Sequence, residues 1–452
     1  MTQYGKLPVL EALFNTVKIK KPPIGIENTL FVCVQHLLHT SVDLFETLIA
    51  LGANPQHIFL LGKHYSTCNA VVTRIKELGI QLQELTPLQK LGEYTPVFNA
   101  DLFSMWQKVQ NHLKHHNITA AIVLDDGGKC LEFITQGILK EIPTIGIEQT
   151  TAGLFNPTVI NLRAPFIDVA SCAVKIHLES NLIIEAILEK LNAILPFQKN
   201  VLTCGVVGVG VIGKTVAKKL LSLGYNVLLY DQEVNVYDNV KTATCCVSLG
   251  QLIHKADYIF GCTGRDITEN LDLEEIIDHD KVFISCTSED KEFLSLLKNI
   301  ENSHNSPSQF NPLKDIKWSL QNGATIHIIK GGFPVNFDDS GESVPAHKIQ
   351  LTRGLLLIAI IQAIVSLPEL VGKGISGRVM LDPEAQKFIV NTWINAVKTH
   401  DFSDQLIEKF KDIEWILRNS GGTFYESAYI KESFAITQGW LSVQGWLSVS
   451  KN

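Results

Sequence analysis

A glycine motif in residues 205–214, GVVGVGVIGK, restricts the possible folds of this chain more than any other feature. Gly208, Gly210 and Gly213 follow a short β-branched run and precede KTVAKKLLSLG, whose apolar residues recur at helical spacing. A second apolar run, YNVLLYD, ends in Asp231, 18 residues after Gly213. Strand, glycine turn, helix, strand and acid in this order predict a Rossmann dinucleotide-binding fold.

The motif also predicts how a dinucleotide is bound. The residues expected at the pyrophosphate, against the N-terminus of the helix, are Gly208, Gly210, Val211, Ile212 and Gly213. The carboxylate of Asp231 is expected to bind the ribose hydroxyls of the adenosine. Because no arginine follows it in DQEVN, the sequence favours NAD over NADP. The alternative is a Rossmann fold that keeps its glycines for packing and binds no cofactor.

Three later apolar segments predict further strands of the same sheet. They are ADYIFGCTG (256–264), DKVFISCTS (280–288) and ATIHIIKGG (324–332). The first ends at Gly264, whose backbone is expected beside the cofactor, because open α/β sheets bind ligands at the carboxyl ends of their strands.

Residues 28–190 also alternate strand-like and helix-like segments, from TLFVCVQ through HIFLLG, AAIVLDDGG and IPTIGIEQT to TVINLRAP. This alternation predicts a second open α/β sheet. Polar residues follow its strands: His36, the run Asp125-Asp126-Gly127-Gly128 and the run Glu148-Gln149-Thr150-Thr151. Because adjacent residues of a strand point to opposite faces, only one of the two aspartates is expected to enter a cleft.

Composition narrows the class of protein. The 452 residues are 46% hydrophobic and 19% charged, which is typical of a soluble globular chain of several domains. The net charge of -7, without a basic cluster, argues against a nucleic-acid partner. Nine cysteines without a C-x-x-C pair, and no recognisable signal sequence, predict reduced thiols and a cytoplasmic location.

The longest apolar run, GLLLIAIIQAIVSL (354–367), is followed by Pro368. Its 14 residues are fewer than the roughly 20 that a membrane-spanning helix needs. We therefore predict a buried core helix that ends at the proline, and no membrane association.

The order of these segments resembles that of the adenosylhomocysteinase family. HLLHTSVDLFETLIALGA, HYST, VLDDGG, IEQTTAG, the glycine motif, GGFPVN and LDPEAQKFIVNTWI follow one another as the family's motifs do. The resemblance implies two open, doubly wound parallel sheets, with a Rossmann NAD domain inserted in a flavodoxin-like substrate domain. It divides the chain into a substrate-type part (1–192), an NAD domain (193–343), a returning segment (344–425) and a tail (426–452).

The resemblance also implies roles for single residues. His36 matches the family's histidine, and Asp126 matches the second aspartate of its D-D-G-G; both are expected to be catalytic. Thr150, Thr151 and Asn336, at the end of GGFPVN, match positions that contact NAD. The alternatives are that His36 is a hydrogen-bonded core residue and that the threonines only cap a helix.

Several positions depart from the family pattern. Leu38 and Thr40 stand where the family binds adenine, and Gln149 replaces a glutamate that binds the ribose. Asp168 and Cys172 replace a catalytic lysine and an aspartate. We therefore expect no hydrolysis of S-adenosylhomocysteine. Two functions stay open: an NAD-dependent oxidoreductase acting on a hydroxyl of another small molecule, or an inactive NAD-binding pseudoenzyme with a protein partner.

Three further features lead to separate hypotheses. Lys63, Arg163 and Asp168 either recognise an anionic substrate or reflect drift in a disused pocket. HLKHH (112–116) predicts a solvated helix end rather than a metal site. The family resemblance and the tandem repeat QGWLSVQGWLSV (438–449) together predict a homo-oligomer.

Overall fold

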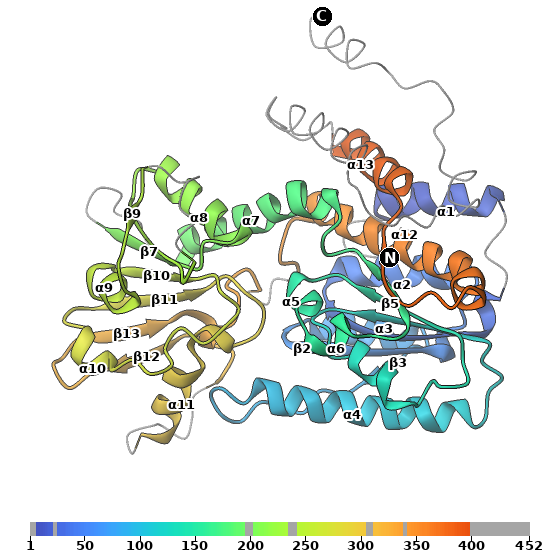
Figure 1. Ribbon diagram of the computed structural model, residues 1–452, viewed down its shortest axis with the longest axis horizontal. Coiled ribbons are helices and arrows are strands. Elements are labelled where there is room, and N and C mark those ends of the chain that lie inside the picture. Colours follow the sequence, from blue (N-terminus) through green and yellow to red (C-terminus); the bar gives the residue numbers. More distant parts are fainter. Residues whose placement is uncertain are drawn as a thin grey trace, which may run out of the picture.

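The computed structural model describes residues 6–20, 25–194, 202–233, 242–303, 311–337 and 341–397. Within these ranges the chain forms two seven-stranded sheets that lie side by side (Figure 1). The first sheet contains β1 (Thr29–Leu37), β2 (Ile58–Thr67), β3 (Gln81–Gln83), β4 (Ala120–Asp125), β5 (Thr144–Glu148), β6 (Pro165–Asp168) and β14 (Gly377–Met380). The second sheet contains β7 (Thr203–Val207), β8 (Asn226–Tyr230), β9 (Thr244–Cys245), β10 (Tyr258–Gly261), β11 (Lys281–Ser285), β12 (Ile316–Ser319) and β13 (Thr325–Ile328).

Helices connect the strands and cover both sheets. The longer ones are α1 (Pro8–Lys20), α2 (His39–Ala50), α3 (Asn69–Glu77), α4 (Tyr94–Leu113), α7 (Ser180–Ile194), α8 (Val211–Ser222), α9 (Leu249–Lys255), α11 (Leu294–Asn302), α12 (Ala346–Gly372) and α13 (Pro383–Val397). Short turns of helix are α5 (Thr151–Leu154), α6 (Pro157–Ile160), α10 (Leu273–Ile276), η1 (Ile26–Asn28), η2 (Pro55–His57), η3 (Leu131–Gln136), η4 (Lys175–Glu179), η6 (Lys291–Phe293) and η7 (Ile329–Gly332).

Both sheets share one strand order. It is β3-β2-β1-β4-β5-β6 in the first sheet and β9-β8-β7-β10-β11-β13 in the second. These strands all pair in parallel, whereas β12 joins the edge of the second sheet antiparallel to β13. The predicted class of two doubly wound α/β sheets is confirmed.

The first sheet differs from flavodoxin in its order. The chain adds β2 and then β3 on one side of β1 before it crosses back to place β4 on the other side. This gives the 3-2-1-4-5-6 order of dinucleotide-binding sheets, whereas flavodoxin has 2-1-3-4-5. The flavodoxin-like label for this domain is therefore corrected by the strand order.

The second sheet is inserted within the first. Strand β14 pairs in parallel with β6, with Gly377 opposite Pro165 and Met380 opposite Asp168, although the whole second sheet separates them in the sequence. Helix α7 runs from the first sheet toward the second (Figure 1). The exact domain boundaries stay predictions, and the tail (426–452) with its tandem repeat lies outside the described residues.

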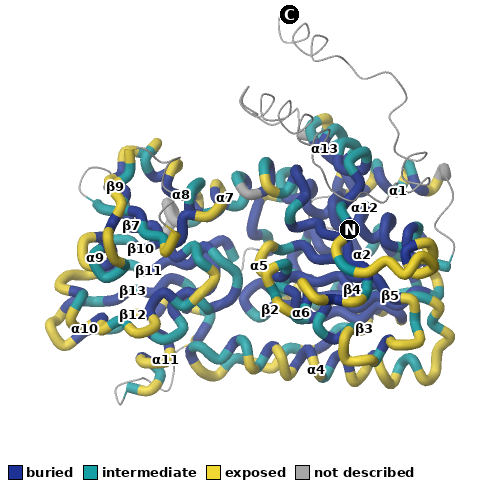
Figure 2. The backbone as a smooth tube through the Cα atoms, viewed as in Figure 1, coloured by how far each residue is buried: buried dark blue, intermediate teal, exposed yellow. Residues whose placement is uncertain are grey.

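Helix α12 is the most apolar element of the protein. Within the described residues it is the one helix long and apolar enough to cross a membrane, yet 78% of its apolar window is buried inside the protein. It packs on the first sheet together with α2 and α1, whereas α4 covers the opposite face with Met105 and Trp106 (Figure 2). The predicted buried helix over 354–367 is confirmed.

Two expectations about local structure are wrong. Helix α12 does not end at Pro368 but continues to Gly372. Its last turn is closed by a hydrogen bond from the N–H of Lys373 to the carbonyl of Glu369. TVINLRAP is not a strand. The side chain of Asn156 accepts a hydrogen bond from the N–H of Thr158 and so caps α6, where Pro157 occupies the first position and suits a helix start.

Candidate functional site

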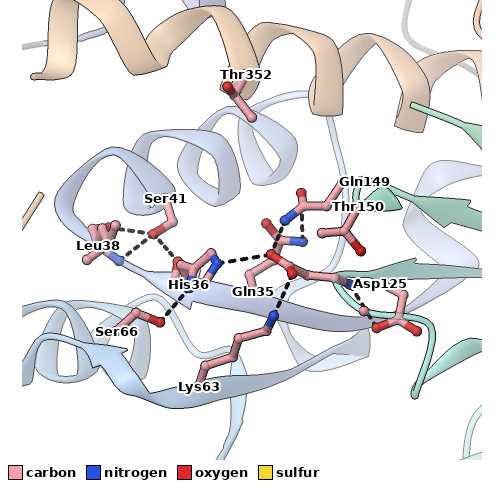
Figure 3. A network of polar contacts seen from close by, with 12 residues as sticks. Gln35, His36, Leu38, Ser41, Lys63, Ser66, Asp125, Gln149, Thr150 and Thr352 are labelled. Atoms are coloured by element: carbon pink, nitrogen blue, oxygen red, sulfur yellow. Dashed lines mark hydrogen bonds and ion pairs between the residues drawn. The ribbon is translucent and has the colours of Figure 1, made fainter. Parts of the chain in front are cut away.

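A buried polar cluster lies at the carboxyl ends of the central strands of the first sheet (Figure 3). His36 comes from β1, Lys63 from β2, and Asp126 and Gln149 from the turns that follow β4 and β5. These four strands are neighbours in the sheet, so their carboxyl ends converge at one place.

Asp126 is the centre of this cluster. Its Oδ1 accepts a hydrogen bond from the Lys63 ammonium at 2.5 Å, and its Oδ2 lies 3.2 Å from His36 Nε2. The amide of Gln149 also donates to Oδ2, and Gln35 donates to Gln149 at 3.3 Å. The side chains of Lys63 and Asp126 are each only 2% exposed, so this ion pair is shielded from water.

The imidazole of His36 is held on several sides. Its Nδ1 lies 2.5 Å from the hydroxyl of Ser66, which also comes from β2. The ring of Phe337 stacks on it with centroids 4.6 Å apart, and Tyr65 meets its edge at 5.8 Å. Asp126, His36 and Ser66 therefore form a continuous hydrogen-bonded chain.

Burial and charge set the protonation of this chain. Burial lowers the pKa of His36 below 6.5, although Asp126 opposes the shift. Burial also acts to raise the pKa of Asp126, but Lys63 and His36 outweigh it and hold that pKa well below its usual range. At neutral pH the cluster thus contains a neutral imidazole beside an ionised carboxylate, which is the state a general base requires.

The adjacent acid, Asp125, has a different role. Its carboxylate accepts hydrogen bonds from the backbone N–H groups of Asp126 and Leu131, both at 2.8 Å, and so shapes the turn after β4. Burial raises its pKa to about 6. As the alternation of strand side chains implies, only Asp126 joins the cluster.

The threonines after β5 have structural contacts. Thr150 caps α5 by accepting a hydrogen bond from the N–H of Gly153, and its own hydroxyl donates to Glu148 at 2.7 Å. Thr151 is exposed in the first turn of that short helix. These contacts match the capping alternative, and an NAD contact for either residue stays a prediction.

The glycine motif in the second sheet has the shape that a dinucleotide needs. Gly208 has φ of 88°, in the left-handed region, where a side chain is strained. A Cβ on Gly213 would lie 1.8 Å from the carbonyl oxygen of Gly208, so the turn and the helix touch backbone to backbone. Gly210 caps α8, and a Cβ added to it would meet no atom within 4 Å; Val211 beside it is 55% exposed.

These features fit NAD. Because a glycine cap covers no backbone N–H group, the first N–H groups of α8 can bind a pyrophosphate. Ile212 lies half-buried in the same turn of α8. Asp231, directly after β8, accepts hydrogen bonds from the N–H groups of Val209 at 2.6 Å and Glu233 at 2.9 Å, which fixes its carboxylate beside the glycine turn.

Gly264 and Asn336 lie on segments that follow strands of the second sheet. Gly264 follows β10 with φ of 68°, and its N–H donates to the carboxylate of Glu292. Asn336 is buried, one residue before the Phe337 that stacks on His36.

The carboxyl edges of the two sheets face each other. Phe333, which follows β13, stacks on Tyr65 with centroids 5.0 Å apart. Thr95, at the start of α4, lies 3.5 Å from the carboxylate of Glu289, which follows β11. The His36 cluster and the cofactor domain therefore border a common region.

Sequence reasoning missed two residues of this region. Ser66 was part of a motif but had no assigned role, and it occupies Nδ1 of His36. Glu292 is fully buried and accepts hydrogen bonds from Thr263 and Thr287 as well as Gly264, and burial raises its pKa to about 7. A serine and a glutamate on ordinary segments carry no spacing signal; only the fold brings them to the site.

The residues that depart from the family pattern, or were expected to recognise another substrate, lie in different parts of the structure. Lys63 belongs to the cluster, but Arg163 is exposed. Asp168 binds Arg378 of β14 and Ser171, so it anchors the edge of the first sheet. Cys172 is buried, and burial raises the pKa of its thiol to about 12, which argues against a nucleophile.

A protein-family model matches the part of the chain that contains β7 to β10 of the second sheet. The model of the NAD-binding domain of the D-isomer specific 2-hydroxyacid dehydrogenases matches residues 187–274. The second sheet is an NAD-binding domain. NAD is accordingly the cofactor, as the sequence predicted.

Two curated relatives match over a longer stretch. Both are uncharacterized proteins of Mycobacterium tuberculosis, from two strains, and each is 26% identical over 350 residues. The match covers 76% of this chain and 66% of each relative, so the chain spans a little under two thirds of the length of these relatives.

Solved structures are similar at low identity. A 2-hydroxyacid dehydrogenase from Ketogulonicigenium vulgare Y25 is 12% identical with a TM-score of 0.35, and covers 70% of this chain and 95% of its own. The TT0316 protein from Thermus thermophilus is 12% identical with a TM-score of 0.34, over 75% and 97%. An NAD-complexed D-isomer specific 2-hydroxyacid dehydrogenase from Lactobacillus delbrueckii ssp. bulgaricus is 14% identical with a TM-score of 0.27, over 42% and 68%.

The adenosylhomocysteinase assignment is wrong. The matching domain model belongs to the 2-hydroxyacid dehydrogenases, which are a different NAD-binding family. The physical reason is that the glycine motif and the acid after the second strand are required by the dinucleotide itself. These residues therefore identify the cofactor and do not separate the families that use it.

Proposed function

We propose that this protein is an NAD-dependent dehydrogenase that oxidises a hydroxyl group of a small-molecule substrate. NAD, when bound, supplies the acceptor for the hydride that leaves the carbinol carbon. The observation that carries the proposal is the neutral imidazole of His36, held between Ser66 and Asp126 at the edge that borders the NAD domain.

The proton of the substrate hydroxyl has a path through these residues. The substrate O–H bond breaks and its proton passes to the oxygen of Ser66, while Ser66 gives its own proton to Nδ1 of His36. The electron pair of that O–H bond forms the carbonyl as the hydride departs. Lys63 keeps Asp126 ionised, so the imidazolium that forms is stabilised by a carboxylate 3.2 Å away.

The domain model suggests which substrates to test first. Because the matched NAD domain is that of D-isomer specific 2-hydroxyacid dehydrogenases, small 2-hydroxy acids are the first substrates to test. Secondary alcohols without a carboxylate form the comparison group, since they separate recognition of the acid from oxidation of the hydroxyl.

The test is the formation of NADH from NAD and a panel of D- and L-2-hydroxy acids and neutral secondary alcohols. We expect turnover with at least one compound and a drop of about 10²- to 10⁴-fold in His36→Gln, the usual contribution of a general base. His254→Gln, which removes an exposed histidine of the NAD domain, serves as the control and keeps full activity. Equal activity in His36→Gln and the control excludes this role for His36.

A second candidate is a protein that binds NAD without turnover and acts through a protein partner. This candidate is favoured by the surroundings of His36. Phe337 stacks on its ring, and Ser66 and Asp126 contact its two nitrogens, so the imidazole is covered by protein groups. Calorimetry and the NADH assay together separate the two candidates: tight NAD binding with no NADH from any compound of the panel supports this one.

A further inference from the structure

Three histidines meet at the end of the first sheet opposite the His36 cluster. His57 ends η2 and directly precedes β2, so it lies at the amino edge of the sheet. Helix α4 returns the chain to that edge and brings His112, in its last turn, and His116, just beyond it, against His57. This trio is therefore separate from the catalytic region at the carboxyl edge.

The ring nitrogens of the trio converge. Nδ1 of His57 lies 2.9 Å from Nε2 of His112. The rings of His112 and His116 stack with centroids 4.0 Å apart. One nitrogen from each of the three rings lies within 4.8 Å of the others.

We propose that His57, His112 and His116 bind a divalent metal ion of the zinc type, with water in the fourth position. Tetrahedral zinc has Zn–N bonds of about 2.0–2.1 Å, which set its ligand nitrogens about 3.3 Å apart. Small movements of the rings bring the nitrogens of the trio to that spacing. His116 is exposed, so its ring has room to move. Three imidazoles without a carboxylate or thiolate suit zinc, nickel or copper better than calcium or magnesium.

The protonation of the trio favours metal binding. Burial and the neighbouring imidazoles lower the pKa of His112 to about 4 and lower that of His57 below 6.5. The rings of His57 and His112 are therefore neutral at pH 7, and each keeps a lone pair for a metal. At 2.9 Å, a ring nitrogen of one histidine donates its proton to a ring nitrogen of the other. A metal ion bound by both nitrogens requires this proton to move to the other nitrogen of its own ring, so that each ligand stays a neutral imidazole.

Neighbouring residues fix the first ligand in place. The amide of Asn54 lies 3.2 Å from Nε2 of His57, and Asn54 is itself held by the N–H of Gln56. Phe59 meets the edge of the His112 ring at 5.1 Å. These contacts hold the rings of His57 and His112 in place before a metal arrives.

The test is titration of the full chain, stripped with a chelator, with Zn²⁺ by calorimetry and with Co²⁺ by visible absorption. We expect one site of micromolar affinity or better, and a tetrahedral cobalt spectrum without a thiolate charge-transfer band. His116→Gln and His112→Gln should each weaken this site at least tenfold. His115→Gln is the matched control, because His115 is exposed in the same turn but lies outside the trio.

Two results would overturn the proposal. One is equal affinity for Zn²⁺ in His116→Gln and His115→Gln, which would show that the trio only forms hydrogen bonds. The other is a cobalt spectrum with thiolate ligation, which assigns the metal to cysteines elsewhere. Because His116 is exposed, its substitution should leave the fold intact, and circular dichroism of the apo variant checks this.

Discussion

The two sheets share one strand order and use the same edge, yet they build opposite kinds of site. At the carboxyl edge of the second sheet the site is formed mainly by backbone groups, in the glycine turn and at the N-terminus of α8. One carboxylate, that of Asp231, binds backbone N–H groups there. At the carboxyl edge of the first sheet the site is made of side chains: a histidine and a lysine from two strands, and an aspartate and a glutamine from the turns after two others.

The difference follows from the role that we propose for each site. A pyrophosphate is recognised by N–H groups in a fixed turn, so a short continuous segment suffices. A proton-transfer site needs a base, a charge partner and shielding from water, and these come from separate strands. A substitution can therefore disrupt the site at one carboxyl edge and leave the site at the other intact.

The largest effect is expected from Lys63→Met in the first sheet. It leaves the buried carboxylate of Asp126 without its cation, which typically costs about 3–5 kcal/mol of unfolding free energy. Urea denaturation measures this, and Lys63→Met/Asp126→Asn should recover part of the loss. Lys76→Met, which breaks an exposed pair with Glu84, is the control, and a similarly small loss in both variants would refute the buried-pair account.

The matched pair Gly213→Ala and Gly210→Ala tests the backbone-built edge. Gly213→Ala forces a Cβ against the carbonyl of Gly208 and should cost about 3 kcal/mol of stability together with NAD binding. Gly210→Ala meets no neighbouring atom, so its thermal unfolding should match the wild type while its affinity for NAD falls. Calorimetry and thermal denaturation of both variants check this, and equal behaviour of the two contradicts the described turn.

Glu292 joins the two kinds of site, since it is a buried side chain that holds the backbone of Gly264. Its pKa in the folded protein is raised to about 7 from 4.5, so the folded state binds the proton more tightly and this group costs stability as the pH rises through 7. Glu292→Gln should therefore raise the unfolding free energy by about 2–3 kcal/mol at pH 8 and change it little at pH 4. Denaturation at both pH values measures this; no dependence on pH, or the reverse one, would refute it.

The smallest effect is expected from Asp231→Ala. It should weaken NAD binding by about 1–3 kcal/mol, because the ribose hydroxyls lose their acceptor and the N–H of Val209 in the glycine turn loses its partner. Calorimetry with NAD and NADP measures the change. Tighter binding of NADP than NAD by the wild-type chain would contradict the role of this carboxylate.

The sequence predicts the two edges to different extents. The glycine motif, the strands and Asp231 lie within one short segment, so both the second sheet and its cofactor could be predicted from local spacing. His36 and Asp126 could be suggested as polar residues after strands, but their pairing with Lys63 and Ser66 depends on which strands are neighbours. No spacing in the sequence encodes that order.

The trio of histidines illustrates the same limit. HLKHH predicts a solvated helix end, and His116 is indeed exposed. The third member, His57, lies 55 residues before His112, and the two meet because a crossover helix returns to the amino edge of the sheet. The homo-oligomer and the cytoplasmic location, inferred from the resemblance, the tail repeat and composition, stay predictions.

The central claim is that the two carboxyl edges form one site, with the cofactor in one sheet and the base in the other. A crystal structure of the chain with bound NAD tests this most directly. We predict that the pyrophosphate lies on Gly210 at the start of α8 and that the nicotinamide ring faces the hydroxyl of Ser66, with room for one substrate carbon between them. A nicotinamide ring turned away from Ser66 and His36, toward solvent, would contradict the account.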